Sequence, residues 1–502
     1  MSPSPTLLLL LPCIVSAVAS GFRALANPLD TIPLGLRSRL AAHPAVTAFA
    51  SSESRTPVES NFSPGVRVSP LDYGGDPTGV RDSSDALASC ISACVNYSIT
   101  LDALGHFPGD SSFGNGHYIA NAGGCSIDLG GGEYLLSKPL LFPEYIGNMV
   151  FGHGSLVADD TPGVFPSDGF LIVVGIQGSC KVPQGSCNVD LGFPELFLNG
   201  RHVASGMQIN NVMGTTIGPS NYFLNFTNYG LQINAGHEVL VDRCWLGETN
   251  FDYPFSVTDL PKSIAIQVNG NDHYLLNTIV FSSKIGVEIN GAADVVTGVH
   301  VWFPMNQALR FVAEGIMAFH INEGGNRFTG CYIDGSRAVF EGSGLAHNVW
   351  TGGFECCAGG GLESVPHGIE LHGDTIGPGL VITQNIFQGG SIFVTPLTPT
   401  KVPQLTGSRV DTNTFRGKGA GSRVTKTMTS PTPNALWTFD FCDVLLVPQI
   451  VHILSVSVFD VPNGYTVNTP IGCMVNVTLN GGGLATSVTL SVDSSSPNPD
   501  LI

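Results

Sequence analysis

The sequence predicts an all-β protein, a right-handed parallel β-helix with a short N-terminal capping helix and a small C-terminal β appendage. Three observations support this fold class. Only 12% of the 502 residues are charged while 62 are glycine, a short strand-like unit recurs along the middle of the chain, and polar and apolar residues alternate within each unit. Low charge and abundant glycine suit a large β protein with many turns, and 43% hydrophobic residues are enough to pack a core.

The recurring unit is a five-residue segment with Gln or Glu third and Asn or His last. It occurs as Gly206–Asn210, Gly230–Asn234, Ala265–Asn269 and Gly286–Asn290, and more loosely as Gly368–His372. The first four start at 206, 230, 265 and 286, so successive starts lie 24, 35 and 21 residues apart. Short strands at such a period are typical of a β-solenoid, whose coils stack at about 4.8 Å. Asn at one corner of successive coils can form a hydrogen-bonded ladder. A leucine-rich repeat has a similar period, but its Leu-x-x-Leu-x-Leu frame is missing.

The flanking segments predict the domain organisation. Residues 1–19 are expected to be a signal peptide, because the apolar run Leu7–Val15 precedes the small-x-small site Ala17–Ala19. Residues 20–66 are expected to be a pro-segment or flexible arm, 67–400 the β-helix and 401–502 the C-terminal β appendage. A helix over Asp85–Val95 is predicted to cover the first coil. The strands of the appendage, expected to be antiparallel and to cover the last coil, are predicted at Leu436–Leu446, His452–Phe459 and Met474–Leu479.

Cysteine content and charge indicate the compartment and the partners. We expect secretion to the cell exterior or cell wall, with disulfides Cys180–Cys187 and Cys442–Cys473 and with N-glycosylation at its sequons. Besides Cys13 the chain has eleven cysteines, an odd number. A net charge of −18 argues against nucleic acid as a partner. No mature stretch is long and apolar enough to span a membrane, and we expect a monomer.

Several segments resemble the pectin-lyase-like superfamily, and more narrowly the divergent plant polygalacturonases of the QUARTET type, near glycoside hydrolase family 28. They are Asp72–Ala86, Gly130–Ser137, Trp245–Glu248, Asn326–Asp334 and Trp437–Phe441. The resemblance covers about residues 66–480 and implies a secreted glycoside hydrolase that cleaves galacturonan or a related pectic polysaccharide, an acidic polymer, without a cofactor or metal. The chain departs from the family pattern, because Asn-Thr-Asp and Arg-x-Lys are missing from the core. Gly152-His153-Gly154 precedes the repeats, so we expect it to form a turn.

Because the usual assignment cannot be transferred, the candidate acids must come from spacing. Glycosidases need two carboxyl groups about 5–5.5 Å apart for retention or roughly 6.5–9.5 Å for inversion, distances that stacked coils can supply. The 35-residue gap predicts an inserted loop between Gly247 and Ser263 that walls a groove. We therefore predict catalytic roles for Glu248, Asp272 and Asp334, with Glu248 and Asp272 in one groove and Asp334 within reach.

The substrate-binding candidates are the cations and one aromatic residue of the central coils, namely Arg243, Lys262, Lys284, Trp302 and Arg327. Cations would neutralise an anionic sugar. Each acid could instead be a turn residue or half of an ion pair. Two other functions stay open: a polysaccharide lyase, recognisable by an unsaturated product that absorbs in the ultraviolet, and a non-catalytic protein that binds cell-wall polysaccharide.

Overall fold

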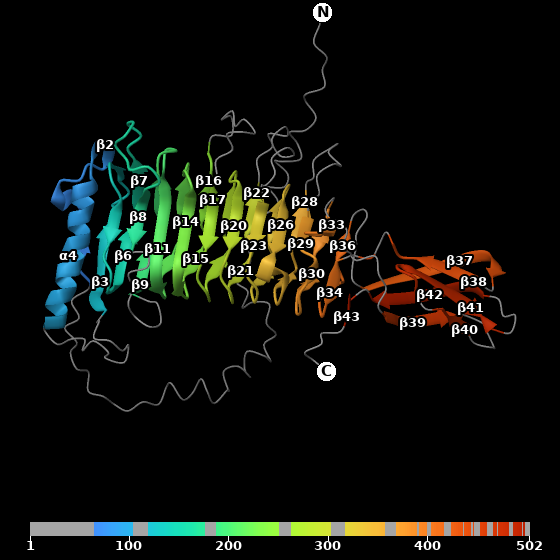
Figure 1. Ribbon diagram of the computed structural model, residues 1–502. Helices are drawn as coiled ribbons and strands as arrows, with labels where there is room; N and C mark the ends of the chain where they lie inside the picture. Colours follow the sequence, from blue (N-terminus) through green and yellow to red (C-terminus); the bar gives the residue numbers. More distant parts are fainter. Residues whose placement is uncertain are drawn as a thin grey trace, which may run out of the picture. The chain divides into compact units, whose positions relative to one another are not determined.

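The computed structural model describes a parallel β-helix and a separate C-terminal β module (Figure 1). The described residues are 65–103, 119–175, 187–249, 263–302, 317–356, 368–388, 391–398, 403–415, 423–434, 436–442, 445, 452–458, 465–468, 470–480, 485–493 and 495–496. The predicted signal peptide and pro-segment, up to residue 64, lie outside them. No helix among these residues is long and apolar enough to cross a membrane.

Each full coil of the β-helix contributes three strands, which we call its first, second and third legs. The first and second legs together form a 22-stranded sheet, and the third legs form a 12-stranded sheet. The first-leg strands are β5 (Leu140–Phe142), β8 (Phe170–Val174), β11 (Ser205–Met213), β14 (Tyr229–His237), β17 (Ile264–Val268), β20 (Ile285–Ile289), β23 (Met317–Ile321), β26 (Arg337–Glu341), β29 (Gly368–His372) and β33 (Ser391–Thr395).

The second-leg strands are β1 (Arg67–Val68), β3 (Ala120–Asp128), β6 (Ile146–Gly152), β9 (Asn188–Phe193), β12 (Thr216–Ile217), β15 (Leu240–Asp242), β18 (Tyr274–Leu276), β21 (Val295–Thr297), β24 (Arg327–Thr329), β27 (Val349–Thr351), β31 (Val381–Thr383) and β35 (Arg409–Asp411). The third-leg strands are β2 (Thr78–Asp82), β4 (Glu133–Leu136), β7 (Gly154–Ala158), β10 (Leu196–Asn199), β13 (Tyr222–Leu224), β16 (Trp245–Gly247), β19 (Ile279–Phe281), β22 (His300–Trp302), β25 (Tyr332–Asp334), β28 (Phe354–Cys356), β32 (Ile386–Phe387) and β36 (Thr414–Phe415). Because β35 and β36 still pair in parallel with β31 and β32, the β-helix continues past residue 400 to Phe415.

The predicted stacking of the repeat units is confirmed. Gln208 pairs in register with Gln232, Gln232 with Gln267, and Gln267 with Glu288, all in parallel strands. The register is kept across the 35-residue gap, since Tyr229 is opposite Ile264. The extra residues therefore do not disturb the pairing, although 250–262 lie outside the described part of the chain.

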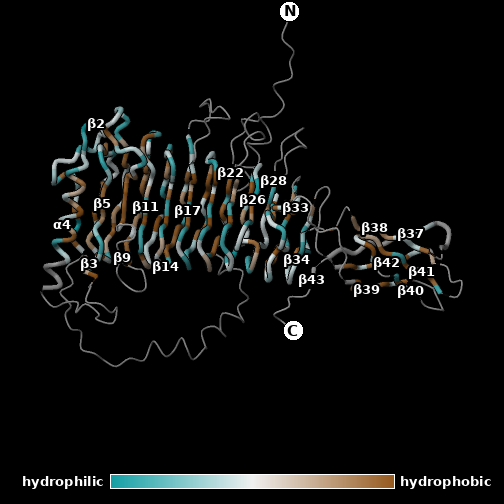
Figure 2. Tube along the Cα trace, in the orientation of Figure 1, coloured by the Kyte–Doolittle hydropathy of each residue, from teal (hydrophilic) through white to brown (hydrophobic). Residues whose placement is uncertain are grey.

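Side-chain alternation places one face of every strand in a single continuous core. In the first leg the inward residues include Met207 and Ile209, followed one coil later by Leu231 and Ile233, and all four are fully buried. Figure 2 shows apolar segments recurring from coil to coil, as this stacking requires. The polar residues between them point outward, so each strand has one face for packing and one for function.

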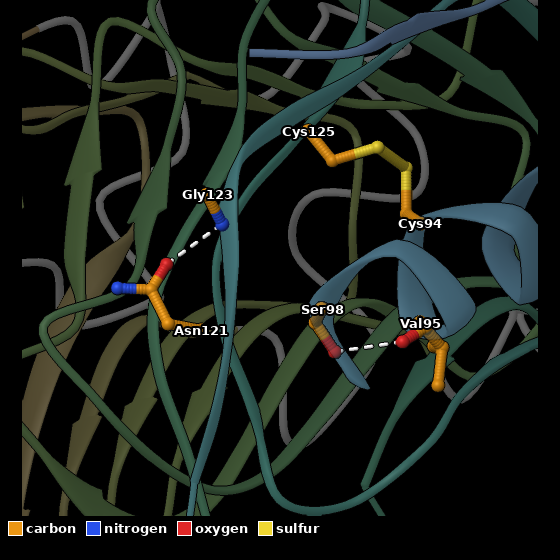
Figure 3. Close-up of a disulfide and its surroundings, with 6 residues drawn as sticks. All are labelled: Cys94, Val95, Ser98, Asn121, Gly123 and Cys125. Carbon is orange, nitrogen blue, oxygen red and sulfur yellow. Dashed lines mark hydrogen bonds between the residues drawn. A yellow bond between two sulfur atoms is a disulfide. The ribbon is translucent and has the colours of Figure 1, made fainter. Parts of the chain in front are cut away.

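A helix, α4 (Ser84–Ala103), lies beside β3 at the N-terminal end of the β-helix (Figure 1). Asp82, two residues before the helix, satisfies the first backbone N–H of the helix, because its Oδ1 accepts a hydrogen bond from Ser84 N–H at 3.1 Å. The helix follows a short 3₁₀ turn, η2 (Pro70–Tyr73), and runs eight residues beyond the predicted end at Val95 (from 95 to 103). A disulfide between Cys94 and Cys125, not predicted from the sequence, ties α4 to β3 (Figure 3).

The C-terminal module has two antiparallel sheets with a hydrophobic cluster of their own. One consists of β37 (Arg423–Asn434), β42 (Ala485–Asp493) and β39 (His452–Val458), the other of β38 (Leu436–Asp440), β41 (Met474–Leu479) and β40 (Tyr465–Val467). The three predicted antiparallel strands correspond to β38, β39 and β41. A small sheet of β30 (Thr375–Ile376), β34 (Gln404–Thr406) and β43 (Ser495–Ser496) returns the chain to the β-helix.

Two disulfides were predicted. Cys442–Cys473 is confirmed, with Cα atoms 5.0 Å apart. Cys187 is disulfide-bonded, but its predicted partner Cys180 lies outside the described residues. Among the residues that the structure describes, Cys90, Cys244 and Cys331 are free thiols, and all three are buried.

Candidate active site

The structure places Glu248 and Asp272 at different corners of the coil. Glu248 follows third-leg strand β16, is buried, and lies 3.2 Å from Nδ1 of His202. Asp272 lies in a left-handed turn between a first-leg and a second-leg strand, with φ of 62°, and contacts His237 at 3.4 Å. A whole first-leg strand separates the two corners. The structure therefore does not bring these two acids together.

The other predicted residues are also distributed around the coil. Asp334 ends a third-leg strand and is opposite Trp302 of the preceding coil, so these two do lie together. Arg243 pairs with Asp242 at the turn from second to third leg, and Arg327 is exposed on the second leg. Lys284 is half-buried just before β20. Lys262 lies outside the described residues.

The outward face of the first leg carries a double row of amides, which we call the amide ladder. Its members are Gln208, Gln232 and Gln267 in one row and Asn210, Asn234, Asn269, Asn290 and Asn322 in the other. Each Gln in turn donates its amide N–H to the next coil, Gln208 to Gln232 and Gln232 to Gln267, both at 2.7 Å. The Asn row donates in the opposite direction, for example Asn269 to Asn234 at 2.7 Å.

The Gln row ends in a cluster of acids and histidines, which we call the acid–histidine cluster: Glu288, His320, Glu341 and His372. Glu288 takes the position of the next Gln and accepts a hydrogen bond from Gln267. His320, one coil later, contacts Glu288 Oε1 through Nδ1 at 3.0 Å and Glu341 Oε1 through Nε2 at 2.8 Å. His372 Nδ1 lies 3.4 Å from Glu341 Oε2.

A salt bridge adjoins the cluster on the same leg. Arg337 Nη1 lies 2.9 Å from Glu370 Oε2, and the side chain of Glu370 is 8% exposed. Arg337 is the only Lys or Arg in the ten described first-leg strands, whereas the same strands contain three carboxylates. The outward face of this leg is therefore acidic, and its one permanent cation is already paired.

The chain is similar in sequence and in fold to several known proteins. No family model matches it. The chain is 30% identical over 301 residues to polygalacturonase QRT3 of Arabidopsis thaliana, an alignment that covers 57% of this chain and 56% of that protein. The predicted resemblance is confirmed. The chain matches only just over half the length of this relative.

Among solved structures, ORF18 of Geobacillus virus E2 is 12% identical, with a TM-score of 0.45 over 85% of this chain and 76% of the other. An exopolygalacturonase from Thermotoga maritima is 10% identical, with a TM-score of 0.41 over 70% and 81% of the two chains.

The environment of His320 decides the charges in the cluster. Burial alone would lower the pKa of His320, but its contacts with Glu288 and Glu341 outweigh burial and raise it. Burial would likewise raise the pKa of Glu288, yet the hydrogen bonds from His320 and Gln267 hold it below its ordinary value. The cluster thus contains a firmly ionised carboxylate next to an imidazole that favours its protonated form.

The spacing of the cluster falls in the range of an inverting acid–base pair. His320 contacts both carboxyl groups, which places the carboxylate oxygens of Glu288 and Glu341 about 7–8 Å apart. The imidazole ring lies between these oxygens, so a substrate would have to lie over the ring. The side chain of Glu341 is 38% exposed and that of Glu288 12%. Glu341 is therefore accessible to a polymer, whereas Glu288 is mostly covered and is held by its hydrogen bond with Gln267.

One group of possible metal ligands lies in the C-terminal module, where Asp440, Cys442 and Cys473 converge. The two sulfurs are joined in the disulfide, so they are not available as thiolate ligands. No other such group occurs among the residues that the structure describes.

Proposed function

We propose that this protein is an extracellular glycoside hydrolase that cleaves a pectic polysaccharide at the acid–histidine cluster. The observation that carries the proposal is the contact of His320 with both Glu288 and Glu341 on the outward face of the first leg. The sequence similarity to a polygalacturonase supports the substrate class.

In this proposal the two carboxyl groups divide the work. Glu341, the more exposed, protonates the glycosidic oxygen, and the ionised Glu288 accepts a proton from the attacking water. His320 is a positioning residue that holds both groups. After each turnover it passes a proton to Glu341 and takes up the proton that Glu288 received from water, so that the acid and the base are both restored. A separation of about 7–8 Å predicts inversion at the anomeric carbon, which NMR of the first product would show.

The proposal moves the catalytic role away from Glu248 and Asp272. Glu248 is buried against His202, and Asp272 lies at another corner with half of its side chain exposed. Asp272→Asn is therefore a matched control for the cluster, since it also removes one carboxylate that contacts a histidine.

The test is reducing-end release from a panel of pectic polymers. Glu341→Gln and Glu288→Gln should each lower kcat at least about a hundredfold, as expected for loss of an acid or base, while Asp272→Asn keeps wild-type turnover. Loss of activity in Asp272→Asn but not in the cluster variants would return the role to the predicted acids. An unsaturated, ultraviolet-absorbing product would identify elimination instead of hydrolysis.

A further inference from the structure

The amide ladder extends from the acid–histidine cluster toward the N-terminal coils, and the ion-pair chemistry of the cluster does not account for it. Gln208, Gln232 and Gln267 are half-buried rather than covered, and Asn269 is exposed. Asn ladders inside a β-solenoid serve the backbone of the turns. The Asn row follows that rule in its first coils, since Asn210 is buried and donates to the backbone oxygens of Val174 and Gly175, and Asn234 is also buried. The Gln row, by contrast, is half-buried on the outward face, with one Gln in each of three coils that lead to the candidate catalytic groups.

The hydrogen bonds within the ladder leave some of its amide N–H groups available to a ligand. Within each coil the Asn donates to the Gln carbonyl oxygen, Asn234 to Gln232 at 3.2 Å and Asn269 to Gln267 at 3.0 Å. The side-chain oxygens of Gln232 and Gln267 each accept a second hydrogen bond from the preceding Gln, so both of their lone pairs are used. Each Gln amide nitrogen has two hydrogens and donates one along the row. One N–H per coil is thus left to face outward, repeated at about 4.8 Å along the stack.

The charge of this face restricts the chemistry of the ligand. The ladder is uncharged, and Arg337, the one Lys or Arg in the first-leg strands that the structure describes, is paired with Glu370. The cluster at the end of the ladder holds His320 between Glu288 and Glu341, so this imidazole is also already paired. A polymer with a free carboxylate on every sugar needs cations to offset its charge. It would instead meet the ionised Glu288, in a protein whose net charge is −18. Hydroxyl groups and ester carbonyls, by contrast, are matched by amides.

We propose that the amide ladder is the substrate-binding platform of this protein and that it takes uncharged sugars, such as methyl-esterified galacturonan, in preference to free polygalacturonate. The inference rests on the proposed function for its catalytic site and adds the substrate class and the direction in which the polymer lies. The polymer runs along the stacked first legs, from the cluster at Glu288 toward Gln208, with about one coil for each sugar.

The experiment places a positive charge on the platform. Gln232→Lys lies two coils from Glu288 and contacts no member of the acid–histidine cluster. Thr329→Lys, on the exposed outward side of second-leg strand β24, adds the same charge away from the platform. kcat/KM is measured for each full-length protein on polygalacturonate and on highly methyl-esterified homogalacturonan, at low ionic strength where charge effects are largest.

The wild-type protein should favour the esterified polymer by about tenfold or more, the scale expected for an uncompensated like-charge contact. Gln232→Lys should reduce that preference at least about threefold, mainly through a lower KM for polygalacturonate, whereas Thr329→Lys leaves the preference unchanged. Gln208→Lys, at the start of the row, repeats the test if Gln232→Lys does not fold.

Two results would overturn the inference while the proposed function stands: a wild-type preference for polygalacturonate, or equal effects of Gln232→Lys and Thr329→Lys. If neither polymer is cleaved, the proposed function fails. The inference is then tested by binding isotherms of the same two polymers to the same proteins. The wild type must bind the esterified polymer more tightly than polygalacturonate, and Gln232→Lys must reduce that difference.

Discussion

Asp294 interrupts a second ladder, inside the β-helix, at the turn from first to second leg. Its Oδ1 accepts the backbone N–H of His273 at 2.8 Å, just as Asn326 and Asn348 accept from the coils before them at 2.8 and 2.7 Å. Asn326 also donates its amide to two backbone carbonyls. Asp294 has no amide to donate, and its buried Oδ2 has no partner among the described residues. We expect Asp294→Asn to complete the ladder.

The magnitude follows from the pKa of Asp294. Burial raises this pKa from 3.8 to about 7. The folded protein therefore holds the proton more tightly than the unfolded chain, so the free energy of unfolding falls as pH rises from about 4 to about 7. The full difference is worth about 4 kcal/mol as an upper bound. Asparagine does not ionise, so it avoids this loss. The free energy of unfolding of Asp294→Asn should exceed that of the wild type by most of this amount above pH 7 and by little below pH 4.

The assay is the thermal midpoint measured at intervals from pH 4 to pH 8. The wild-type Tm should fall across this range relative to that of Asp294→Asn, with the two values converging at pH 4. Asp272→Asn should move the profile in the same direction as Asp294→Asn but by less, because the Asp272 carboxylate adds to the raised pKa of Asp294 by charge repulsion while burial is the larger cause. Parallel pH profiles for the wild type and Asp294→Asn would refute the reasoning.

Two further predictions concern groups described above. Glu355 points into the core between Ile333 and Phe387, burial raises its pKa well above the ordinary value, and neither carboxyl oxygen has a partner in the described part of the chain. Glu355→Leu should raise the free energy of unfolding at pH 7 by about 1–3 kcal/mol, measured by chemical denaturation. If the variant is less stable than the wild type, the Glu355 carboxyl group has a stabilising partner and the reasoning is wrong. For the cluster, kcat/KM should be highest between the lowered pKa of Glu288, below which this base is protonated, and the raised pKa of His320, above which activity falls. The His320→Gln variant should lack that loss of activity at high pH. If kcat/KM of His320→Gln falls at the same high pH as that of the wild type, another group causes the fall.

Most of the fold could be predicted from the sequence because it repeats a local rule. The Gln-x-Asn units set the coil period, and alternation within each unit set the inward and outward faces, so parallel register followed. The helix end and the Cys94–Cys125 disulfide could not be predicted, since both depend on which coil α4 covers. Strand β37 was missed because Pro431 and Pro433 argue against a strand, yet β37 is an edge strand, where proline is tolerated.

The candidate site was harder to predict because inserted loops drew attention to Glu248. The useful signal lay in the repeat itself, where Glu288 replaces the Gln of three earlier coils. His320 and Glu341 gave no such signal, because their contact depends on a register between coils 32 and 21 residues apart in sequence (from 288 to 320 and on to 341). A charged residue among uncharged residues at one position of successive coils indicates a site, but only when the register between the coils is known.

The amide ladder also separates two ways in which such a protein can change during evolution. Three successive coils each contribute one Gln and one Asn. Duplication of the 21-residue coil that starts at 265 would therefore lengthen the platform by about 4.8 Å and leave its ends unaltered. A single substitution in the Gln column, such as the Glu at position 288, changes charge without changing length. The length of polymer that the platform binds can thus change by duplication of coils, while the charge that faces one sugar can change by point mutation, and neither change requires the other.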